Sequence, residues 1–388
     1  MREGSWDQGR EIAQNSFISL VSQALPLGQC VGRIAATDLH SLCNLPAYAT
    51  SSMDGWAIAG SAPWKIIGEV ATGKKSELTL APGQSLRIAT GGVIPDGCEA
   101  VIPWEEATES GGTILGEVAL GANIRPAALE SKQGELLIPA GTRLTPPMVG
   151  LLAATGHDTI AVTRKPKIAI FFLGDELIHS GVPEGGAIRD ALGPQLPSLL
   201  NNLGAEVIIT DFVEDDLDVL ITKAKSVVGA VDLVITTGGT ADGPRDFVKP
   251  TIAALHGEYL IDCARVRPGY HILLASIPTS DRAIPFIALP GNPQSALAAL
   301  TSFGIPVIDS LLGKKPEPLA PISLASAQKT PENFSRVVPG TVVDGIFTPT
   351  EYLNSAMLRG VAFADGFAVI NPGNHPAGEP ARWITFTY

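Results

Sequence analysis

Residues 167–174 read KIAIFFLG, an unbroken apolar run that is typical of a strand buried on both faces. The pattern returns as EVIITDFV (206–213) and VDLVITTGG (231–239). The stretches between them, PQLPSLLNNLG (194–204) and DLDVLITKAKSVVG (216–229), have the spacing of helices. Continuous apolar strands that alternate with helices predict a parallel sheet covered on both faces. Because ligands bind at the carboxyl ends of such strands, functional residues are expected just after each strand.

The remaining sequence divides into regions of different pattern. Residues 9–25 (GREIAQNSFISLVSQAL) place apolar side chains at helical spacing and predict one amphipathic helix that ends before Pro26. Short apolar runs separated by Gly, Pro and Ser predict a β-rich block, and TPPMVGLLAATG (145–156) predicts a return to helix. The predicted domains are a helical or linker domain (1–45 and 140–165), an inserted β-rich domain (46–139), an α/β domain (166–314) and a C-terminal all-β domain (315–388).

Length, charge and cysteine content limit the class of protein. A chain of 388 residues suggests about two to four domains. The net charge of −12 argues against broad attraction to nucleic acid or to an anionic membrane. The four cysteines lack the spacing of zinc sites or disulfide frameworks. The N-terminus is polar, and Pro290, Pro293 and Pro306 interrupt the apolar stretch 289–312, so the sequence predicts a cytoplasmic protein without a membrane span.

Carboxylates follow the predicted strands or precede the next helix. Any one of these aspartates could simply cap a helix, and capping is at least as good an explanation for each residue alone. Their recurrence at one sheet edge favours a cation, because gathered carboxylates repel one another. Hard oxygen ligands favour Mg²⁺, which usually bridges protein carboxylates and substrate phosphates. The residues concerned are Asp175, Glu176, Asp190, Asp215, Asp216, Asp242 and Asp246.

Two turns at this edge suit an anion. Gly238-Gly239 after a buried strand lets backbone N–H groups approach a ligand closely. The stretch ALPGNPQSALAAL (288–300) braces a turn between Pro290 and Pro293. Pro293 suits the first helical position, with Asn292 as N-cap and Ser295 in the first turn, and this helix end is expected to receive an oxyanion or phosphate.

Other catalytic patterns are missing from the sequence. It contains no GxGxxG or Walker A loop, and the six histidines lie apart, without HExxH or GxSxG. The stretch SSMDGW (51–56) could be an ordinary tight turn at Asp54-Gly55, with Met53 and Trp56 packed in a core. No protein nucleophile is therefore predicted.

Several motifs together resemble the molybdopterin molybdenumtransferase family, to which the E domain of gephyrin also belongs. They are GRIAATDLHSLCNLPAYATSSMDGWAI (32–58), RIATGGVIPDGCEAVIPWEEA (87–107), GDEL (174–177), TTGG (236–239) and LPGNPQS (289–295). The resemblance implies a four-domain protein with a central molybdopterin-binding α/β domain, a helical domain carrying the inserted β-rich domain, and a C-terminal β-barrel. It also implies a homodimer whose active cleft lies between the α/β domain of one subunit and the β-rich domain of the other.

The reaction that the resemblance implies is Mg²⁺-dependent insertion of molybdate into adenylylated molybdopterin with release of AMP. By motif position, Asp54 and Thr90 would face the cleft across the dimer. The acids that match catalytic and Mg²⁺-associated positions are Glu176, Asp190, Asp215 and Asp246, with Asp54 as a further catalytic residue. The substrate-binding positions are Thr90, Gly238, Gly239, Arg267, Pro290, Asn292, Pro293, Ser295, Arg336 and Ser355, of which Ser295, Arg336 and Ser355 align with groups that hold molybdate.

The chain departs from the family pattern in a few places. Arg267-Pro268-Gly269-Tyr270-His271 replaces Lys-Pro-Gly-Lys-Pro, Leu173 replaces a Thr or Ser, and PAALE (126–130) replaces a Gly-Glu-Asp pattern. Losing one cation at a buried oxyanion site is expected to weaken binding about ten- to a hundredfold. These departures leave an alternative open: a catalytically weakened paralogue that binds or carries molybdopterin.

Overall fold

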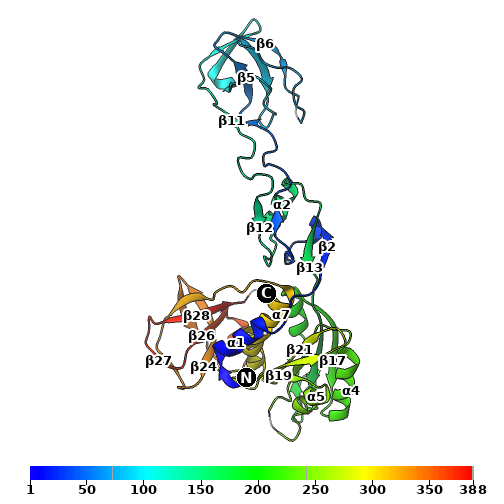
Figure 1. Cartoon of the computed structure of the whole chain (residues 1–388). Helices are drawn as coiled ribbons and strands as arrows, with labels where there is room; N and C mark the ends of the chain where they lie inside the picture. Colours follow the sequence, from blue (N-terminus) through cyan, green and yellow to red (C-terminus); the bar gives the residue numbers. More distant parts are fainter. Residues whose placement is uncertain (72, 242, 387–388) are drawn as a thin grey trace.

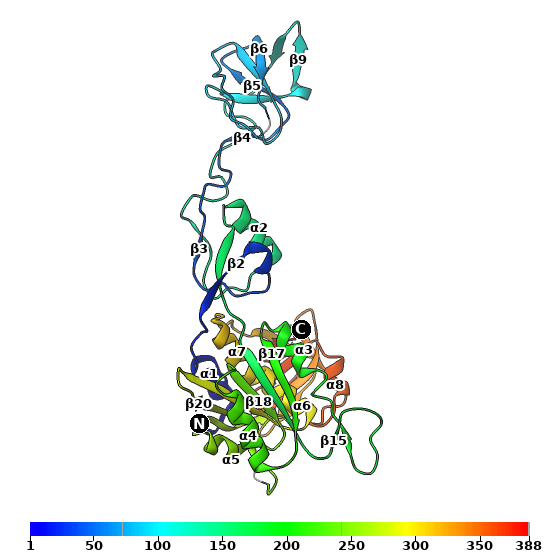
Figure 2. The same ribbon diagram turned by 90° about the vertical axis from the view of Figure 1, so that its right-hand side faces the viewer.

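The computed structural model describes residues 1–71, 73–241 and 243–386, and it is elongated. Asp242, one of the carboxylates predicted to follow a strand, lies outside the described residues. The α/β region and a C-terminal β region lie side by side at one end, and the inserted β-rich domain lies at the other (Figure 1, Figure 2). A slender segment connects the two ends. The inserted β-rich domain therefore lies far from the C-terminal β region of the same chain.

The central sheet belongs to a region of mixed α/β structure, and only part of it is parallel, whereas the sequence predicted a parallel sheet. Its strand order is β17-β14-β18-β21-β20-β19, and the first four strands are parallel. β20 runs antiparallel to both of its neighbours. The sheet is therefore mixed, because β20 and β21 are joined by a connection too short for a parallel crossover. The strands are β14 (Lys167–Leu173), β17 (Glu206–Val213), β18 (Leu233–Thr237), β19 (Glu258–Arg267), β20 (Leu273–Pro278) and β21 (Ala283–Leu289).

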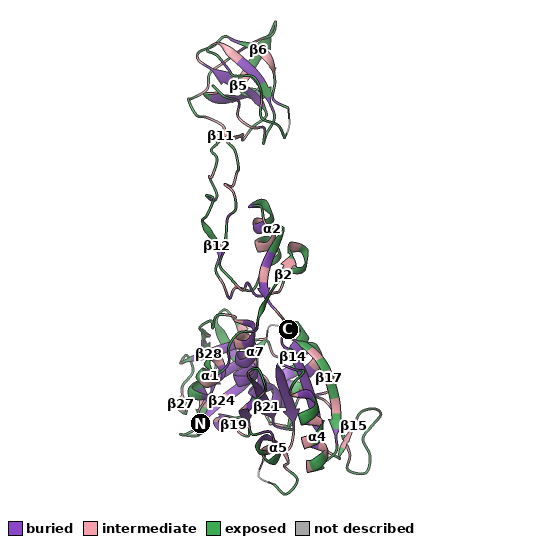
Figure 3. Ribbon diagram, turned by 45° about the vertical axis from the view of Figure 1, so that its right-hand side comes forward, coloured by how far each residue is buried: buried purple, intermediate pink, exposed green. Residues whose placement is uncertain are grey.

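Helices cover both faces of this sheet, as predicted. One core packs side chains of α4 and α5 against the sheet, and the other packs α1, α3, α6 and α7 against its opposite face. Figure 3 shows the purple buried strands between these layers. The helices are α1 (Trp6–Asn15), α3 (Leu196–Asn202), α4 (Leu217–Val227), α5 (Val248–Ala254), α6 (Pro293–Ala299) and α7 (Ile305–Leu312).

The helix predicted over residues 9–25 is wrong in its bounds. α1 starts after a capping box at Ser5 and ends at Asn15, whereas β2 (Ser22–Pro26) is a strand that pairs with β13 (Thr159–Thr163). The helical apolar spacing was misleading because a strand far along the chain, β13, satisfies the backbone of β2. α1 packs on α7, and β1 (Arg2–Ser5) pairs with β19, so the N-terminus lies on the α/β domain.

The connecting segment is mixed in structure. It holds one α-helix, α2 (Pro146–Ala154), which begins at Pro146 as predicted, and a short 3₁₀ turn at Leu27–Gln29. Its strands are β2 paired with β13 and β3 (Leu39–His40) paired with β12 (Leu136–Ile138), and turns and irregular chain connect them. Its small core therefore comes from strands as much as from the helix.

The inserted domain is β-rich, as predicted. Its sheet has the order β8-β5-β7-β6-β10-β9, and a second pair, β4 with β11, closes the base of the domain. Apolar side chains form separate clusters on the two faces of the sheet. The strands are β4 (Thr50–Ser51), β5 (Gly55–Ala59), β6 (Trp64–Glu69), β7 (Gln84–Ile88), β8 (Ala100–Pro103), β9 (Ala107–Ser110), β10 (Thr113–Gly116) and β11 (Ile124–Arg125).

The C-terminal region is a barrel-like sheet. Its order is β24-β25-β22-β28-β26, and β26 pairs back with β24 to close the ring. β24 also pairs with β19, so the barrel is joined to the α/β sheet. The elements are β22 (Ala320–Leu324), β23 (Gln328–Thr330), β24 (Ser335–Val343), β25 (Ile346–Pro349), α8 (Arg359–Ala362), β26 (Gly366–Ile370), β27 (Gly373–His375) and β28 (Pro380–Thr385).

One helical run among the described residues, Pro293–Leu312, is long and apolar enough to cross a membrane. In its apolar window 83% is buried inside the protein, as in a core helix. The expectation that Pro306 breaks this stretch is wrong, since a π-helical turn, Leu300–Gly304, joins α6 to α7. The wider turn accommodates the missing proline N–H without ending the helix.

Asp232, directly before β18, holds two arginines together. Its carboxylate is 4% exposed and accepts hydrogen bonds from Arg164 (2.7 Å), from Arg282 and from the backbone N–H of Lys167 (2.8 Å). We predict that Asp232→Asn lowers the free energy of unfolding by about 2–3 kcal/mol, because two partly buried guanidinium groups lose their shared counter-ion.

Urea denaturation would measure this loss. Asp281→Asn is the matched control, since Asp281 is exposed near Arg282 and its change should stay within about 0.5 kcal/mol. Equal effects of the two variants would contradict the structural role of Asp232.

Candidate functional site

Three turns meet at the carboxyl edge of the parallel strands. They follow β14, β18 and β21, and the Gly238 N–H donates to the carbonyl of Leu289 at 2.9 Å. A Cβ on Gly238 would lie 3.0 Å from the Leu173 carbonyl oxygen, and one on Gly291 would lie 3.4 Å from the Gly238 Cα. Gly238 and Gly239 both have positive φ, +85° and +62°. Glycine is therefore needed here both for close approach and for backbone conformation.

Charged side chains gather on the turns after β14 and β17. The Asp215 N–H donates to Asp175 Oδ1 at 2.9 Å, and Arg245 Nη1 lies 3.7 Å from Asp175 Oδ2. Burial raises the pKa of Asp215, and the neighbouring charges of Asp175 and Glu176 raise it further, whereas Arg245 opposes them. We call Asp175, Glu176 and Asp215 the acidic cluster. Its carboxylates repel one another more than the single nearby arginine compensates.

Two other predicted metal-site acids have structural partners. Asp190 is 7% exposed and accepts the N–H groups of Leu192 (2.9 Å) and Gly193 (3.0 Å). Asp246 accepts the Gly243 N–H at 2.7 Å. Hydrogen bonds within local turns, rather than helix capping, therefore engage these two carboxylates, since the N-caps of α3 and α5 are Gln195 and Phe247.

The predicted four-acid ligand set is not assembled. Within the described ranges, no group of three or more His, Cys, Asp or Glu side chains is arranged to hold a metal ion. Glu176 and Asp215 do lie together with Asp175 in the acidic cluster, and Arg245 lies beside Asp175. Arg245 was missed at the sequence level, although its place just after the Gly238-Gly239 turn was a usable signal.

The first turn of α6 does not present free N–H groups to an anion. Pro293 has no donor, and the N–H groups of Gln294 and Ser295 both donate to the carbonyl of Ser355, at 3.0 and 3.3 Å. Asn292 is the N-cap, as predicted, but its side chain makes no capping bond. The expectation that this helix end receives an oxyanion through its backbone is therefore wrong for this conformation. Ser295 and Ser355 are nevertheless brought together.

A buried glutamine, missed at the sequence level, fixes the loop that carries Ser355. Gln294 is 0% exposed, and with its amide nitrogen facing the loop it donates to the carbonyls of Met357 (2.9 Å) and Asn354 (3.2 Å). This loop connects β25 to α8 in the barrel. The start of α6 thus holds the barrel against the α/β domain through three protein donors.

Two arginines lie on neighbouring strands beside α6. Arg267 and Arg336 are paired positions of the parallel ladder between β19 and β24. The Arg267 guanidinium lies 4.5 Å from the ring centroid of Phe334, a cation–π contact. A Cβ on Gly269 would be 3.5 Å from the Ser295 carbonyl oxygen, so this strand end packs on α6. The two cations and Ser295 therefore share one region.

Tyr270 points toward the N-terminal strand. Its hydroxyl donates to Glu3 Oε1 at 2.5 Å, and this bond, assisted by burial, raises the pKa of Tyr270 to about 12. Its ring also contacts Phe334, with centroids 5.7 Å apart. The phenol is therefore neutral and engaged with Glu3, at a position where the family has a lysine.

Asp54 and Thr90 lie in the other half of the chain. Asp54 Oδ1 accepts the Thr90 N–H at 2.7 Å, and both residues are exposed. They flank β5 and β7 in the inserted domain, which is far from the α/β sheet in the same chain (Figure 1). The predicted site is therefore divided between the two ends of the molecule.

Curated relatives decide the family. A molybdopterin molybdenumtransferase of Nostoc sp. is 32% identical over 73% of this chain and 67% of its own length. The chain belongs to the molybdopterin molybdenumtransferase family. The protein of the same name from Bacillus subtilis is 28% identical over 91% of this chain and 86% of its own length. The predictions of this family and of a transferase are confirmed by these relatives.

Family models and a solved structure agree with the molybdopterin molybdenumtransferase assignment. The models are the MoeA N-terminal region, domains I and II (residues 5–156), a probable molybdopterin binding domain (169–310) and the MoeA C-terminal region, domain IV (322–386). The crystal structure of a molybdopterin biosynthesis MoeA protein from Pyrococcus horikoshii matches with a TM-score of 0.82 and 26% identity, covering 99% of both chains. The multidomain fold is therefore shared along nearly the whole chain.

The role of Gln294 can be tested against its neighbour Asn292. We predict that Gln294→Leu lowers the free energy of unfolding by about 1–3 kcal/mol, because two carbonyl groups lose their buried donor. Amide hydrogen exchange of residues 354–358 should also become faster. Asn292→Ala is the control, and its effect should be smaller because the Asn292 side chain makes no capping bond. Equal losses in the two variants would contradict this account.

Proposed function

We propose that the chain inserts molybdate into adenylylated molybdopterin in a Mg²⁺-dependent reaction that releases AMP. Support comes from the family and from the α/β region, which matches a probable molybdopterin binding domain. The observation that carries the proposal is the arrangement of charge at one sheet edge. β19 is parallel to β21, so Arg267 at its carboxyl end lies at the same edge as the acidic cluster. This arrangement supports a cation site and an oxyanion site on either side of the glycine turns.

The acidic cluster fits a metal ion that is shared with substrate. Mg²⁺ commonly takes one or two protein carboxylates and completes its shell with water and phosphate oxygens. Glu176 and Asp215 would supply those carboxylates, and a bound cation would relieve the repulsion that raises the pKa of Asp215. When bound, Mg²⁺ would neutralise charge on the phosphates of the adenylylated substrate. The protein's part is to hold the phosphates beside Gly238 and Gly239, where backbone can approach them closely.

The arginines suit the second anion. Guanidinium forks match the oxygens of a tetrahedral dianion, and the contact with Phe334 restricts Arg267 before any ligand arrives. The hydroxyl groups of Ser295 and Ser355 lie at the same end of α6 and would add neutral hydrogen bonds. Because the N–H groups of α6 are already used, we assign molybdate binding to these side chains, with Arg336 as the second cation.

A second copy of the chain would complete the site. Asp54 and Thr90 lie far from the α/β domain of their own chain, and the inserted domain is carried away from it by the connecting segment (Figure 2). We therefore propose a cytoplasmic homodimer in which the inserted domain of one subunit faces the α/β domain of its partner. The transferase relatives do not favour the carrier alternative, although Tyr270, a neutral phenol bound to Glu3, leaves this position without the charge of a lysine.

Molybdate-dependent AMP release tests the proposed reaction. Purified protein should release AMP from adenylylated molybdopterin only when both Mg²⁺ and molybdate are present. Asp215→Asn should slow release about 10- to 100-fold and reduce the rise in melting temperature that Mg²⁺ causes, since one charge-assisted contact is lost. Tight substrate binding without AMP release would support the carrier alternative instead.

Asp216→Asn is the matched control for that variant. Asp216 accepts the Val219 N–H at 3.0 Å as the N-cap of α4, and asparagine caps equally well. The substitution removes the same charge one residue away. The Asp216→Asn variant should keep both AMP release and the rise in melting temperature with Mg²⁺. If it loses them, the loss in Asp215→Asn would come from the change in net charge and not from a specific contact of Asp215.

Tyr270→Lys tests the electrostatics of the proposed molybdate site. A lysine alone would be partly neutralised by Glu3, so we predict at most about a threefold gain in molybdate affinity. In Glu3→Gln/Tyr270→Lys the added cation is free, and the gain should reach about tenfold. Isothermal titration calorimetry with molybdate would measure both, with Glu3→Gln alone as control. No gain in the double variant would contradict the assigned molybdate site.

A further inference from the structure

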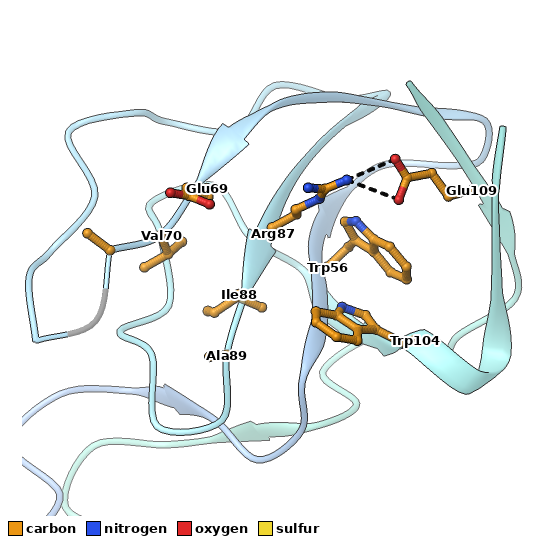
Figure 4. Close-up of a pocket in the computed structure, with 9 residues that line it drawn as sticks. Trp56, Glu69, Val70, Arg87, Ile88, Ala89, Trp104 and Glu109 are labelled. Carbon is orange, nitrogen blue, oxygen red and sulfur yellow. Dashed lines mark hydrogen bonds and ion pairs between the residues drawn. The ribbon is translucent and has the colours of Figure 1, made fainter. Parts of the chain in front are cut away.

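The inserted domain contains a pocket of about 580 Å³ that the proposed reaction does not yet use (Figure 4). This volume lies within the range of small-molecule binding sites. Its walls include Trp56, Trp104, Arg87, Glu69 and Glu109. Aromatic and charged side chains in one pocket are typical of a site for an organic ligand rather than of a packing defect.

Strand register brings three of these side chains together. Trp56 on β5 is directly opposite Arg87 on β7, and Arg87 is paired with Glu69 on β6. Paired positions project to the same face of a sheet, so the three side chains form a row. Trp104 comes from the 3₁₀ turn Trp104–Glu106 after β8, and Glu109 comes from β9. Four strands and a turn therefore position the pocket.

The two tryptophans provide an aromatic wall. Their ring centroids are 6.0 Å apart with planes inclined by 46°, and Trp56 is 6% exposed whereas Trp104 is 54% exposed. Trp56 thus supports Trp104, which keeps much of its indole uncovered at the pocket. Figure 4 shows the indoles on one side and Val70 and Ile88 on the other. A flat ring stacked on Trp104 would cover exposed indole surface, whereas Val70 (7% exposed) and Ile88 (2% exposed) are core side chains that offer little surface to its other face.

The charges in the pocket select against phosphate. Arg87 Nη2 already binds Glu109, with distances of 2.9 and 3.2 Å to the two carboxylate oxygens. Glu69 adds a second carboxylate, so the three ionised groups leave an excess of negative charge. A carboxylate that faces an aromatic slot accepts hydrogen bonds from an amino group on a ring edge. The ligand is therefore expected to be uncharged and to carry an amine.

The pocket adjoins the part of the inserted domain that carries Asp54 and Thr90. The backbone N–H of Trp104 donates to the backbone carbonyl of Asp54 at 3.3 Å. The backbone N–H of Thr90 donates to the Asp54 carboxylate. Thr90 follows Ala89, which lines the pocket. A substrate that reaches Asp54 would therefore have this slot beside it.

We propose that this pocket binds an amino-bearing fused nitrogen heterocycle, stacked on Trp104 with its amine directed to Glu69. The identity of the ring rests on the proposed function, because the proposed substrate, adenylylated molybdopterin, contains two such heterocycles, adenine and pterin. The phosphates of that substrate remain outside the pocket, toward Asp54 and the partner's glycine turns. The inserted domain thereby contributes a base-binding subsite and determines which end of the substrate enters first.

Calorimetric titration of the full-length protein tests the subsite, with adenosine and 6-hydroxymethylpterin as probes and without molybdate or Mg²⁺. Trp104→Ala should weaken the probe that binds about 5- to 100-fold, as expected for loss of base stacking. Trp104→Phe keeps an aromatic face and should stay within about threefold. Leu115→Ala removes a half-exposed apolar side chain of the same domain, away from the pocket, and should change nothing.

The amine contact has its own test. Adenosine should bind about tenfold more tightly than purine riboside, which lacks the amino group, and Glu69→Gln should reduce that preference. If the pterin is the ring that binds, its Trp104 dependence supports the same pocket. Binding of neither probe, or equal affinity in the Trp104→Ala variant and the unchanged protein, would overturn the proposal.

These measurements detect binding alone, so their failure differs from failure of the proposed reaction. If AMP release is not observed but Trp104-dependent binding is, the subsite stands and only the reaction falls. If AMP is released and the ring does not bind in a Trp104-dependent way, the reaction stands and the subsite falls.

Discussion

Parallel pairing of β14, β18 and β21 is the constraint on which the site depends. It aligns three carboxyl ends so closely that a Cβ on Gly238 would lie 3.0 Å from the Leu173 carbonyl oxygen, whereas one on Gly291 would only reach ordinary contact distance, 3.4 Å. Buried apolar residues on both faces fix this register, since a slip would move every side chain to the wrong layer. The acidic cluster and the arginine pair are consequences of that alignment, because each follows a strand whose direction is already set. Local changes in the turns can therefore alter chemistry without altering the sheet.

The C-terminal barrel changes which groups at the sheet edge are free to bind an anion. Its Ser355 carbonyl occupies the N–H groups that a free helix terminus would offer to an anion, and Gln294 holds the same loop through its buried amide. The backbone dipole of α6 is thus satisfied within the protein. In the proposed function, recognition of the oxyanion is therefore assigned to Arg267 and Arg336, which carry full charges on long side chains. The barrel, which supplies Arg336 and Ser355, would then form part of the proposed site.

The sequence was sufficient where the determining contacts are local or periodic. Apolar runs predicted β14, β17 and β18, and the proline and asparagine positions predicted the start of α6. It was insufficient where a distant partner decides. Residues 22–26 look helical but pair with β13, and Tyr270 is occupied by Glu3, which lies at the opposite end of the sequence. Asp190 and Asp246 show a further limit, since a carboxylate before a turn has the same pattern whether it binds backbone or metal.

Charge segregation explains how an acidic protein can bind an anionic substrate with defined orientation. A net charge of −12 repels anions in general, and the interaction is screened over about 8 Å at physiological ionic strength. Binding of an anionic substrate then depends only on the charged groups close to it. In the proposed arrangement, Glu69 and Glu109 would disfavour phosphate in the tryptophan pocket, and the acidic cluster would accept phosphate only together with a cation. The proposed arginine site would accept an anion directly. Three regions of different charge would then favour different parts of the substrate, a ring, a phosphate and an oxyanion, before any shape complementarity is required.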